Sequence, residues 1–178
     1  MEEKELVRRI IDGDTAMFSQ LLKRYQRPVH SMIRQIINCR EDAEELTQDV
    51  FIKAFKSLNK FRGDCSLSTW LYRIAYNTAI SATRKKDRHM SDIDDSYLNN
   101  IPDDMVDRVL EKVEDELQLQ RLEAAIDLLD IEAKALISLY YTEDKSVNEI
   151  SEILQLSPDN VKVKLFRTRK KLVFLINN

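Results

Sequence analysis

The sequence predicts an all-α protein, in which two small helical domains are joined by an acidic flexible linker and the second ends in a helix-turn-helix. Three observations predict this fold class. The 178 residues include only two glycines and three prolines, which are the residues that most often interrupt helices. Apolar residues recur at helical spacing on both sides of a polar, acidic stretch. The segment 146–172 has the pattern of two helices joined by a tight turn.

The first domain is expected to span residues 1–90. A helix from about Glu3 ends at Gly13, and Asp14 is placed to cap the next helix. A further helix is expected to begin after Pro28. The long helix that follows from about Asp42 has a core stripe of Ala43, Leu46, Val50, Phe51, Ala54, Phe55 and Leu58. After a loop at 59–68, the last helix, from about Ser68 to Lys86, turns inward Leu71, Ile74, Ala75, Thr78 and Ala82.

The stretch 91–105 is polar and acidic and contains Pro102, a composition typical of a linker. The second domain is then expected to span residues 106–178. It begins with a helix at about Val106, whose apolar positions include Leu117, and a helix at 131–141 precedes the helix-turn-helix.

The net charge of −3 conceals an uneven distribution along the chain. Residues 1–86 have 16 basic and 11 acidic side chains, whereas residues 87–116 have 3 basic and 11 acidic ones. Residues 157–178 have six basic side chains and a single acidic one. Two basic regions therefore flank an acidic centre.

The C-terminal segment has the features of a DNA-reading motif. Ser157 can cap its second helix, with Pro158 at the first helical position. Apolar residues on one side and cations on the rest of that helix are typical of a recognition helix. A plain, solvated C-terminal helix is the alternative. Gln155 occupies the turn position where such motifs often have glycine, at a cost of about 1 kcal/mol if its φ is positive.

A second nucleic-acid surface is predicted on the helix 68–86. Opposite its core stripe lie Trp70, Arg73, Asn77, Ile80 and Arg84, residue types that contact phosphates, base edges and unstacked bases. The polar loop before it, residues 61–66, could hold an extruded base. An ordinary amphipathic helix with Trp70 half in the core is an equal alternative. On the helix 42–58, Ile52 interrupts a polar face, which can mark a site for a partner helix.

The composition argues against several other classes of protein. Two glycines cannot build a phosphate-binding loop, and no apolar run approaches the length of a membrane span. The charged N-terminus does not have the pattern of a secretory signal. Cys39 and Cys65, with His30 and His89, match no metal-binding spacing and suit a reducing cytoplasm. We therefore expect no catalytic residue, no metal, no cofactor and no membrane insertion.

Taken together, the order of the segments resembles the extracytoplasmic-function (ECF) group of bacterial sigma-70-type sigma factors, along nearly the whole chain. The matching motifs are GDTAMFSQLLKRY, DAEELTQDVFIKAF, FRGDCSLSTWLYRIAYNTAISATRK and SVNEISEILQLSPDNVKVKLFRTRKKL. The chain departs from the family pattern at Ser81, Ser151 and Gln155.

The resemblance implies a set of roles. The first domain would correspond to sigma region 2 and the second to sigma region 4, and the acidic linker would thread the RNA-exit path of the polymerase. The β′ clamp helices of core RNA polymerase would bind Asp42, Glu45, Gln48, Asp49 and Ile52. The −10 promoter element would be melted and held by Phe61, Arg62, Asp64, Trp70, Arg73, Asn77 and Arg84. The −35 element would be read by Asn160, Lys162, Lys164, Arg167 and Lys171.

The partners implied by this resemblance are core RNA polymerase, promoter DNA and an inhibitory anti-sigma factor, which no feature of the sequence identifies. Two alternatives remain at this stage. A conventional helix-turn-helix regulator would bind a palindromic duplex as a dimer without polymerase. A helical adaptor protein with solvated basic faces would bind no specific DNA.

Overall fold

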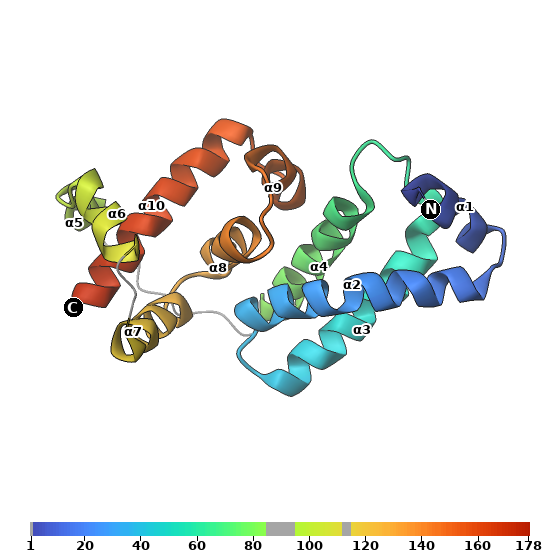
Figure 1. Cartoon of the computed structure of the whole chain (residues 1–178), viewed down its shortest axis with the longest axis horizontal. Helices are drawn as coiled ribbons and strands as arrows, with labels where there is room; N and C mark the ends of the chain where they lie inside the picture. The colour runs from blue at the N-terminus through green and yellow to red at the C-terminus, as the bar shows by residue number, and fades with distance from the viewer. Residues whose placement is uncertain (1, 85–94, 112–114) are drawn as a thin grey trace.

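The computed structural model describes residues 2–84, 95–111 and 115–178, and every regular element within these ranges is helical. The helices form two groups, α1 to α4 and α5 to α10, with the two chain ends far apart (Figure 1). This confirms the all-α fold class. The hydrophobic core extends through both groups, because buried residues of α2 and α4 meet buried residues of α8 and α9.

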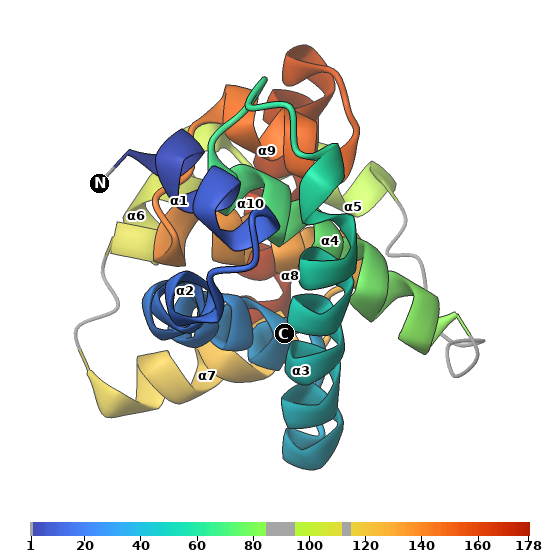
Figure 2. The same ribbon diagram turned by 90° about the vertical axis from the view of Figure 1, so that its right-hand side faces the viewer.

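The first group contains α1 (Glu3–Ile11), α2 (Thr15–Ile36), α3 (Arg40–Ser57), a short 3-10 turn η1 (Leu58–Lys60) and α4 (Leu67–Thr83). Asp14 caps α2 by accepting a hydrogen bond from the N–H of Met17, as its position predicted. Ser66 caps α4 in the same way through the N–H of Thr69. α3 and α4 pack against each other and against α2, and the three helices enclose the core of this group (Figure 2).

Two expectations for this group are wrong. A new helix was expected after Pro28, but α2 runs through it without a break. Proline in a helix interior costs about 3 kcal/mol, and the continuous buried face formed by Tyr25, Val29, Met32 and Ile33 offsets that cost. Phe55 was expected in the core but is half exposed, because it packs edge-on against Phe18 at the surface between α2 and α3.

The second group contains α5 (Asp95–Asn99), α6 (Asp103–Glu111), α7 (Glu116–Asp127), α8 (Ile131–Ile137), a turn of π-helix η2 (Ser138–Thr142), α9 (Val147–Leu154) and α10 (Pro158–Asn177). α10 is central to it and contacts α5, α6, α7, α8 and α9. The helix expected to run on from Val106 is two helices, α6 and α7, and Leu117 on α7 is exposed instead of buried.

The segment expected to be a linker lies partly outside the described residues, since residues 91–94 are not among them. Within the described part, residues 95–105 form α5 and the start of α6, and both helices pack on α10. Their contact is anchored by Leu98 and Val106, which are each 3% exposed. An apolar residue every helical turn or two on an acidic segment is enough to hold it on a neighbouring helix.

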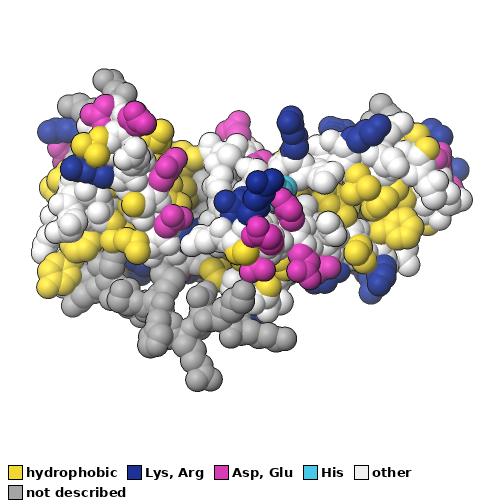
Figure 3. All heavy atoms as spheres, turned by 90° about the horizontal axis from the view of Figure 1, so that it is seen from below, with side chains coloured by type: hydrophobic (Ala, Val, Ile, Leu, Met, Phe, Trp, Pro, Cys, Tyr) yellow, Lys and Arg dark blue, Asp and Glu magenta, His cyan; other side chains and the backbone are white. Residues whose placement is uncertain are grey.

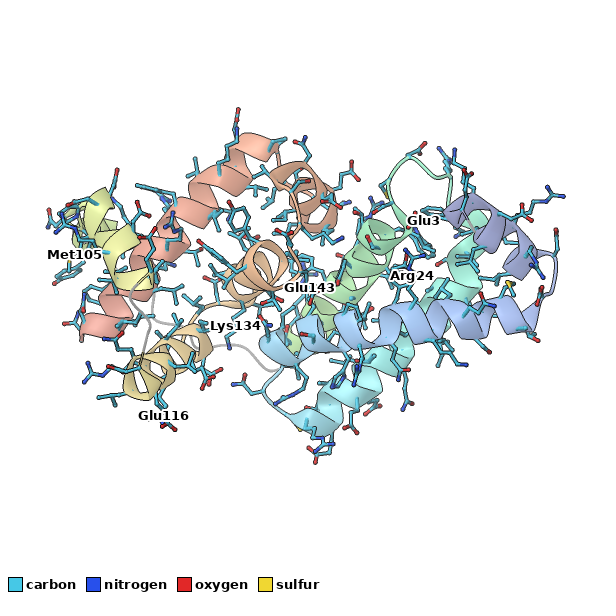
Figure 4. The ribbon with its side chains drawn as sticks, viewed as in Figure 1. Glu3, Arg24, Met105, Glu116, Lys134 and Glu143 are labelled. Atoms are coloured by element: carbon cyan, nitrogen blue, oxygen red, sulfur yellow. The ribbon has the colours of Figure 1, made fainter. Side chains whose placement is uncertain are left out.

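The two groups touch directly, because α9 lies against α4 and α8 against α2 (Figure 1). Polar bonds cross this contact: Tyr72 donates to Glu143 at 2.5 Å, Lys145 donates to Ser68 at 3.0 Å, and Thr69 is 3.5 Å from Glu149. Figure 4 shows Glu143 between the groups. Burial, with the hydrogen bond to Glu143 and its charge, raises the pKa of Tyr72 well above the usual range.

Candidate nucleic-acid and protein interfaces

The helix-turn-helix has the expected local chemistry. Ser146 and Glu149 form a capping box at the start of α9, in which each side chain bonds the other's backbone N–H. Gln155 ends α9 with φ +59° and ψ +43°, the left-handed conformation that glycine adopts without strain. Ser157 then caps α10, with Pro158 in its first turn. The turn therefore has the geometry of the motif although it has no glycine.

Helix α10, the predicted recognition helix, buries Val161, Leu165 and Leu172, as its periodicity predicted. Of the residues predicted to read DNA, Asn160, Lys162 and Arg167 are exposed. Lys164 is half-buried and forms an ion pair with Glu132 of α8. Lys171 lies 3.8 Å from Asp130, between α8 and α10. Three of the five predicted residues are thus exposed, and Lys162 among them lies 3.9 Å from Asp159 of the same helix. The other two, Lys164 and Lys171, are paired with acidic residues at α8.

Two apolar residues on the outward face of α10 were not singled out by the sequence analysis. Val163 is 53% exposed and Phe166 is 43% exposed, and both lie among the cations of that face. They line a groove of about 410 Å³ together with Leu98, Asn99, Lys162, Arg167 and Lys170. Their exposure could have been predicted from their positions in the helical repeat, because both residues lie opposite the buried stripe of α10.

The loop 61–66 and α4 form the second candidate surface. Phe61 packs on Trp70 with ring centroids 5.4 Å apart, so both aromatic rings lie where the loop meets the helix. Arg62 and Asp64 in the loop are exposed, as are Asn77 and Arg84 on α4, whereas Trp70 and Arg73 are half-buried. The second group contacts α4 through Thr69, which is 3.5 Å from Glu149 of α9, and through Ser68 and Tyr72, which bond Lys145 and Glu143 just before α9. The predicted nucleic-acid face is therefore exposed at Asn77 and Arg84 and partly covered at Trp70 and Arg73.

Helix α1 supports this loop, a role that the sequence analysis did not assign. Glu3 accepts a 2.9 Å hydrogen bond from the N–H of Leu67 at the start of α4 and a 3.2 Å bond from the hydroxyl of Tyr25 on α2. Lys4 borders Gly63, which has φ +75°. Figure 4 labels Glu3 on the side of α1 that faces the rest of its group. No local sequence pattern links Glu3 to Leu67, so this contact could be identified only from the tertiary structure.

The residues predicted to bind polymerase divide between two grooves beside α3. Gln48 and Ile52 line a groove of about 720 Å³ between α2 and α3, and its other apolar residues are Phe18, Leu22, Phe51 and Phe55. Asp42, Glu45 and Asp49 line a second groove of about 680 Å³, whose far wall is the α7–α8 connection and includes Leu128 and Lys134. The exposed Ile52 is confirmed, with 51% of its surface accessible.

The first groove is apolar and the second is acidic at its rim. Figure 3 shows hydrophobic side chains gathered on the α1–α4 half of the molecule and acidic ones nearer its centre. An apolar groove beside an exposed helix suits the helix of a partner protein. The acidic rim would select cationic groups on that partner.

Among residues 2–84, 95–111 and 115–178, no group of three or more His, Cys, Asp and Glu side chains is placed to hold a metal ion. His89, one of the residues considered for such a site, lies outside these ranges. Within the same ranges, no helix is long and apolar enough to cross a bilayer.

Comparison with known proteins places these surfaces in a family context. The family model "Sigma-70 region 2" matches residues 21–89, and "Sigma-70, region 4" matches residues 119–172. The ECF RNA polymerase sigma-E factor of Haemophilus influenzae is 31% identical over 178 residues, covering 97% of this chain and 94% of the relative. The RNA polymerase sigma-H factor of Pseudomonas aeruginosa is 28% identical over 177 residues, covering 96% and 92%.

Two solved structures are similar to this one. A structure of CnrH in complex with the cytosolic domain of CnrY matches with a TM-score of 0.72 and 23% identity, over 98% of this chain and 97% of that chain. The sigma factor RpoE from Bartonella quintana, in complex with the anti-sigma factor NepR, matches with a TM-score of 0.66 and 20% identity, over 90% and 96%. At these identities the similarity establishes the fold alone. Helix α1 and the segment 95–111 lie outside both family-model matches.

Proposed function

The chain belongs to the ECF group of sigma-70-type RNA polymerase sigma factors, and from that premise we propose a function with three steps. The protein binds core RNA polymerase through α3 and reads a −35 element with α10. It captures and opens a −10 element with α4 and the loop 61–66. Proteins of this family recognise promoters; the assignment of each step to these residues is our proposal. The observation that carries it is the pair of outward faces, one on α10 and one on α4, that belong to two separate helical groups.

Duplex recognition is assigned to the exposed residues of α10. Lys162 and Arg167 can contact phosphates or guanine edges, and Asn160 can pair with an adenine edge. Val163 and Phe166 lie between them and can contact the methyl group of thymine, which only the major groove presents. Lys164 and Lys171 are paired with Glu132 and Asp130, so they would contact DNA only by exchanging these carboxylates for phosphates.

Strand capture is assigned to α4 and its loop. Asn77, Arg73 and Arg84 would contact the exposed strand, and Phe61 and Trp70 would stack on unpaired bases. Extruding a base costs a few kcal/mol, and stacking at about 1–3 kcal/mol per base offsets that cost. The protein would thus open DNA by binding the melted strand, without catalysis of its own.

Polymerase binding is assigned to Asp42, Glu45, Gln48, Asp49 and Ile52, with the β′ clamp helices as the partner. The apolar groove beside Ile52 would bury aliphatic side chains of the clamp, and the acidic residues would pair with its cations. The acidic segment between the groups would follow the basic RNA-exit path. An anti-sigma factor is a further proposed partner, because the RpoE structure to which this chain is similar contains one.

Co-elution with bacterial core RNA polymerase in gel filtration tests the polymerase step. We expect the wild-type chain to form a stoichiometric complex and Ile52→Asp to lose it, because the substitution puts a charge into the groove. Ile11→Asp is a matched control, since Ile11 on α1 is also 51% exposed but lines neither of the two grooves beside α3. A well-folded wild-type chain that forms no complex with a closely related core enzyme would point instead to a stand-alone regulator.

The DNA steps need a promoter fragment, which can be selected from a randomised duplex library with the wild-type holoenzyme. Asn77→Ala should leave the closed complex intact and reduce strand opening, measured by permanganate reactivity of unpaired thymines. Arg167→Ala should weaken the closed complex itself by about 1–3 kcal/mol and relax the preference at one −35 position. Full opening by Asn77→Ala would refute the −10 assignment.

A further inference from the structure

Two cations near the middle of α10 are occupied by the acidic segment 95–111. Arg169 forms a 2.5 Å ion pair with Asp107 of α6, and Lys170 forms a 3.1 Å ion pair with Asp103 at the start of the same helix. Neither cation is among the residues assigned above to DNA reading.

Lys170 faces outward although it is buried. It lies three residues after Arg167 and four after Phe166, so the three side chains share one face of α10. Its ammonium group is 4.5 Å from the centre of the Phe166 ring. Lys170 is hidden because α5 and α6 cover this face, not because it points into the core. The groove lined by Lys162, Val163, Phe166 and Arg167 ends at Lys170 and at Leu98 and Asn99 of α5.

The covering segment is held by a small apolar contact and is strongly acidic. Leu98 and Val106 are buried, and Tyr97 packs near Phe174 with ring centroids 6.0 Å apart. Helix α6 presents Asp103, Asp104, Asp107 and Glu111 and has a single basic residue, Arg108. Carboxylates spaced along a surface are the intramolecular equivalent of a row of phosphates.

We propose that Arg169 and Lys170 are further phosphate-binding residues of the recognition helix, and that the acidic segment 95–111 occupies them until duplex DNA displaces it. This inference rests on the proposed function of α10 and extends it. Lys162 and Lys170 are eight residues apart, roughly 12 Å along the helix axis, which is about the width of the major groove. Cations this far apart on one helix face can contact different phosphates of the duplex at the same time.

The contact is weak enough to be displaced. In both ion pairs the carboxylate is open to solvent, with Asp107 58% and Asp103 74% accessible, and solvent-screened ion pairs contribute about 0–1 kcal/mol each. A duplex offers a continuous row of phosphates and gains further free energy from released counterions. A covered recognition helix binds DNA with an affinity reduced by the fraction of molecules in which it is uncovered. Residues 95–105 of this segment belong to the acidic stretch 91–105 that is proposed to enter the basic RNA-exit path. Binding of that stretch by polymerase and binding of α10 by DNA would therefore both remove the cover from α10.

The test is binding of the full-length chain to a short fluorescein-labelled duplex of arbitrary sequence, measured by anisotropy at several salt concentrations. Phosphate contacts are independent of sequence, so no promoter is needed. Asp103→Asn/Asp107→Asn should bind roughly tenfold more tightly than wild type if both ion pairs are lost. The matched control is Asp104→Asn/Glu111→Gln, which removes the same charge from the same helix. Asp104 pairs with Arg108 of the same helix, and both control positions are exposed.

A second pair of variants tests the phosphate assignment. In the Asp103→Asn/Asp107→Asn chain, adding Arg169→Ala and Lys170→Ala should reduce the slope of log affinity against log salt by about 0.9 for each lost contact. Lys23→Ala/Arg27→Ala, which removes two exposed cations from α2, should leave that slope unchanged. Thermal unfolding of each variant ensures that only folded chains are compared.

Equal affinities for Asp103→Asn/Asp107→Asn and its matched control would overturn the covering role. An unchanged salt slope after loss of Arg169 and Lys170 would overturn the phosphate role. Co-elution of the same variants with core polymerase is measured in parallel. A wild-type chain that fails to co-elute would refute the proposed function, whereas normal co-elution with equal DNA affinities would refute this inference alone.

Discussion

The hydroxyl of Tyr72 on α4 donates a 2.5 Å hydrogen bond to the carboxylate of Glu143, which lies just beyond η2 in the other helical group. Tyr72 is buried, and the ammonium group of Lys145 lies 5.4 Å from the centre of its ring. One side chain thus meets an anion and a cation of the second group. The helix assigned to the −10 element and the connection that leads into the helix-turn-helix are joined by this contact.

Removing that hydroxyl should loosen the contact between the groups. A hydrogen bond to a charged acceptor contributes about 1.5–3 kcal/mol, so Tyr72→Phe should lower the free energy of unfolding by up to that amount. Urea unfolding measures the change. Tyr97→Phe is the control, because Tyr97 is mostly exposed and packs near Phe174 through its ring. Equal midpoints for the two variants would show that the hydrogen bond contributes nothing.

Stability should also fall at alkaline pH. Burial raises the pKa of Tyr72 and of Tyr76, with added contributions from Glu143 and Glu132 respectively. Because the folded pKa values lie above the unfolded value of about 10, the stabilisation from the neutral hydroxyls is fully present below about pH 10 and is lost as the pH rises further. Urea midpoints on either side of this pH measure the loss. Tyr72→Phe should show a smaller decrease, and an identical pH dependence would contradict the assignment.

Glu3 should protect the start of α4 from solvent exchange. Its carboxylate accepts the N–H of Leu67, one of the backbone groups that have no partner within the helix. Glu3→Ala should cost about 1 kcal/mol, as the loss of a helix cap does. It should also accelerate hydrogen exchange at the amide of Leu67, which NMR can follow. Glu5→Ala removes an exposed charge from the same helix and should leave that amide unchanged. Equal exchange rates in the two variants would exclude a capping role for Glu3.

Replacing glutamine by glycine at position 155 should increase the stability of the folded protein. Gln155 has φ +59°, where a side chain costs about 1–2 kcal/mol and glycine costs nothing. The greater freedom of glycine in the unfolded chain removes part of that gain, so Gln155→Gly should stabilise the protein by roughly 0.5–1 kcal/mol. Gln120→Gly, in the interior of α7, should destabilise it by about the same amount. A lower melting temperature for Gln155→Gly would show that Gln155 makes contacts worth more than its backbone strain.

Several features of this protein were predictable because they depend on neighbours along the chain. The caps at Asp14 and Ser157 act within three residues. The buried stripe of α10 and the exposed Ile52 follow from a repeat of 3.6 residues per turn. The order of the four motifs identified the family, and the family models and the relatives confirm it.

Structural predictions from local sequence patterns were wrong where residues distant in the chain pack against each other. Pro28 signals a helix boundary, but the buried face of α2 on both sides of it keeps the helix continuous. Phe55 has the spacing of a core residue, yet it lies at the edge of the groove between α2 and α3, where no further helix covers it. The acidic composition of residues 95–105 is typical of a linker, but Leu98 and, just beyond it, Val106 bind this segment to α10.

The sequence by itself determined that this protein is helical, that it belongs to the sigma factors, and which helix faces are polar, because periodicity, capping and charge are properties of short segments. Only the tertiary structure decided which of those faces remain available. The ion pairs of Lys164, Arg169 and Lys170, the bond between Glu3 and Leu67, and the contact of Tyr72 with Glu143 each join residues distant in the chain. Such contacts form only when packing of the whole core brings their helices together, so no window of the sequence contains them.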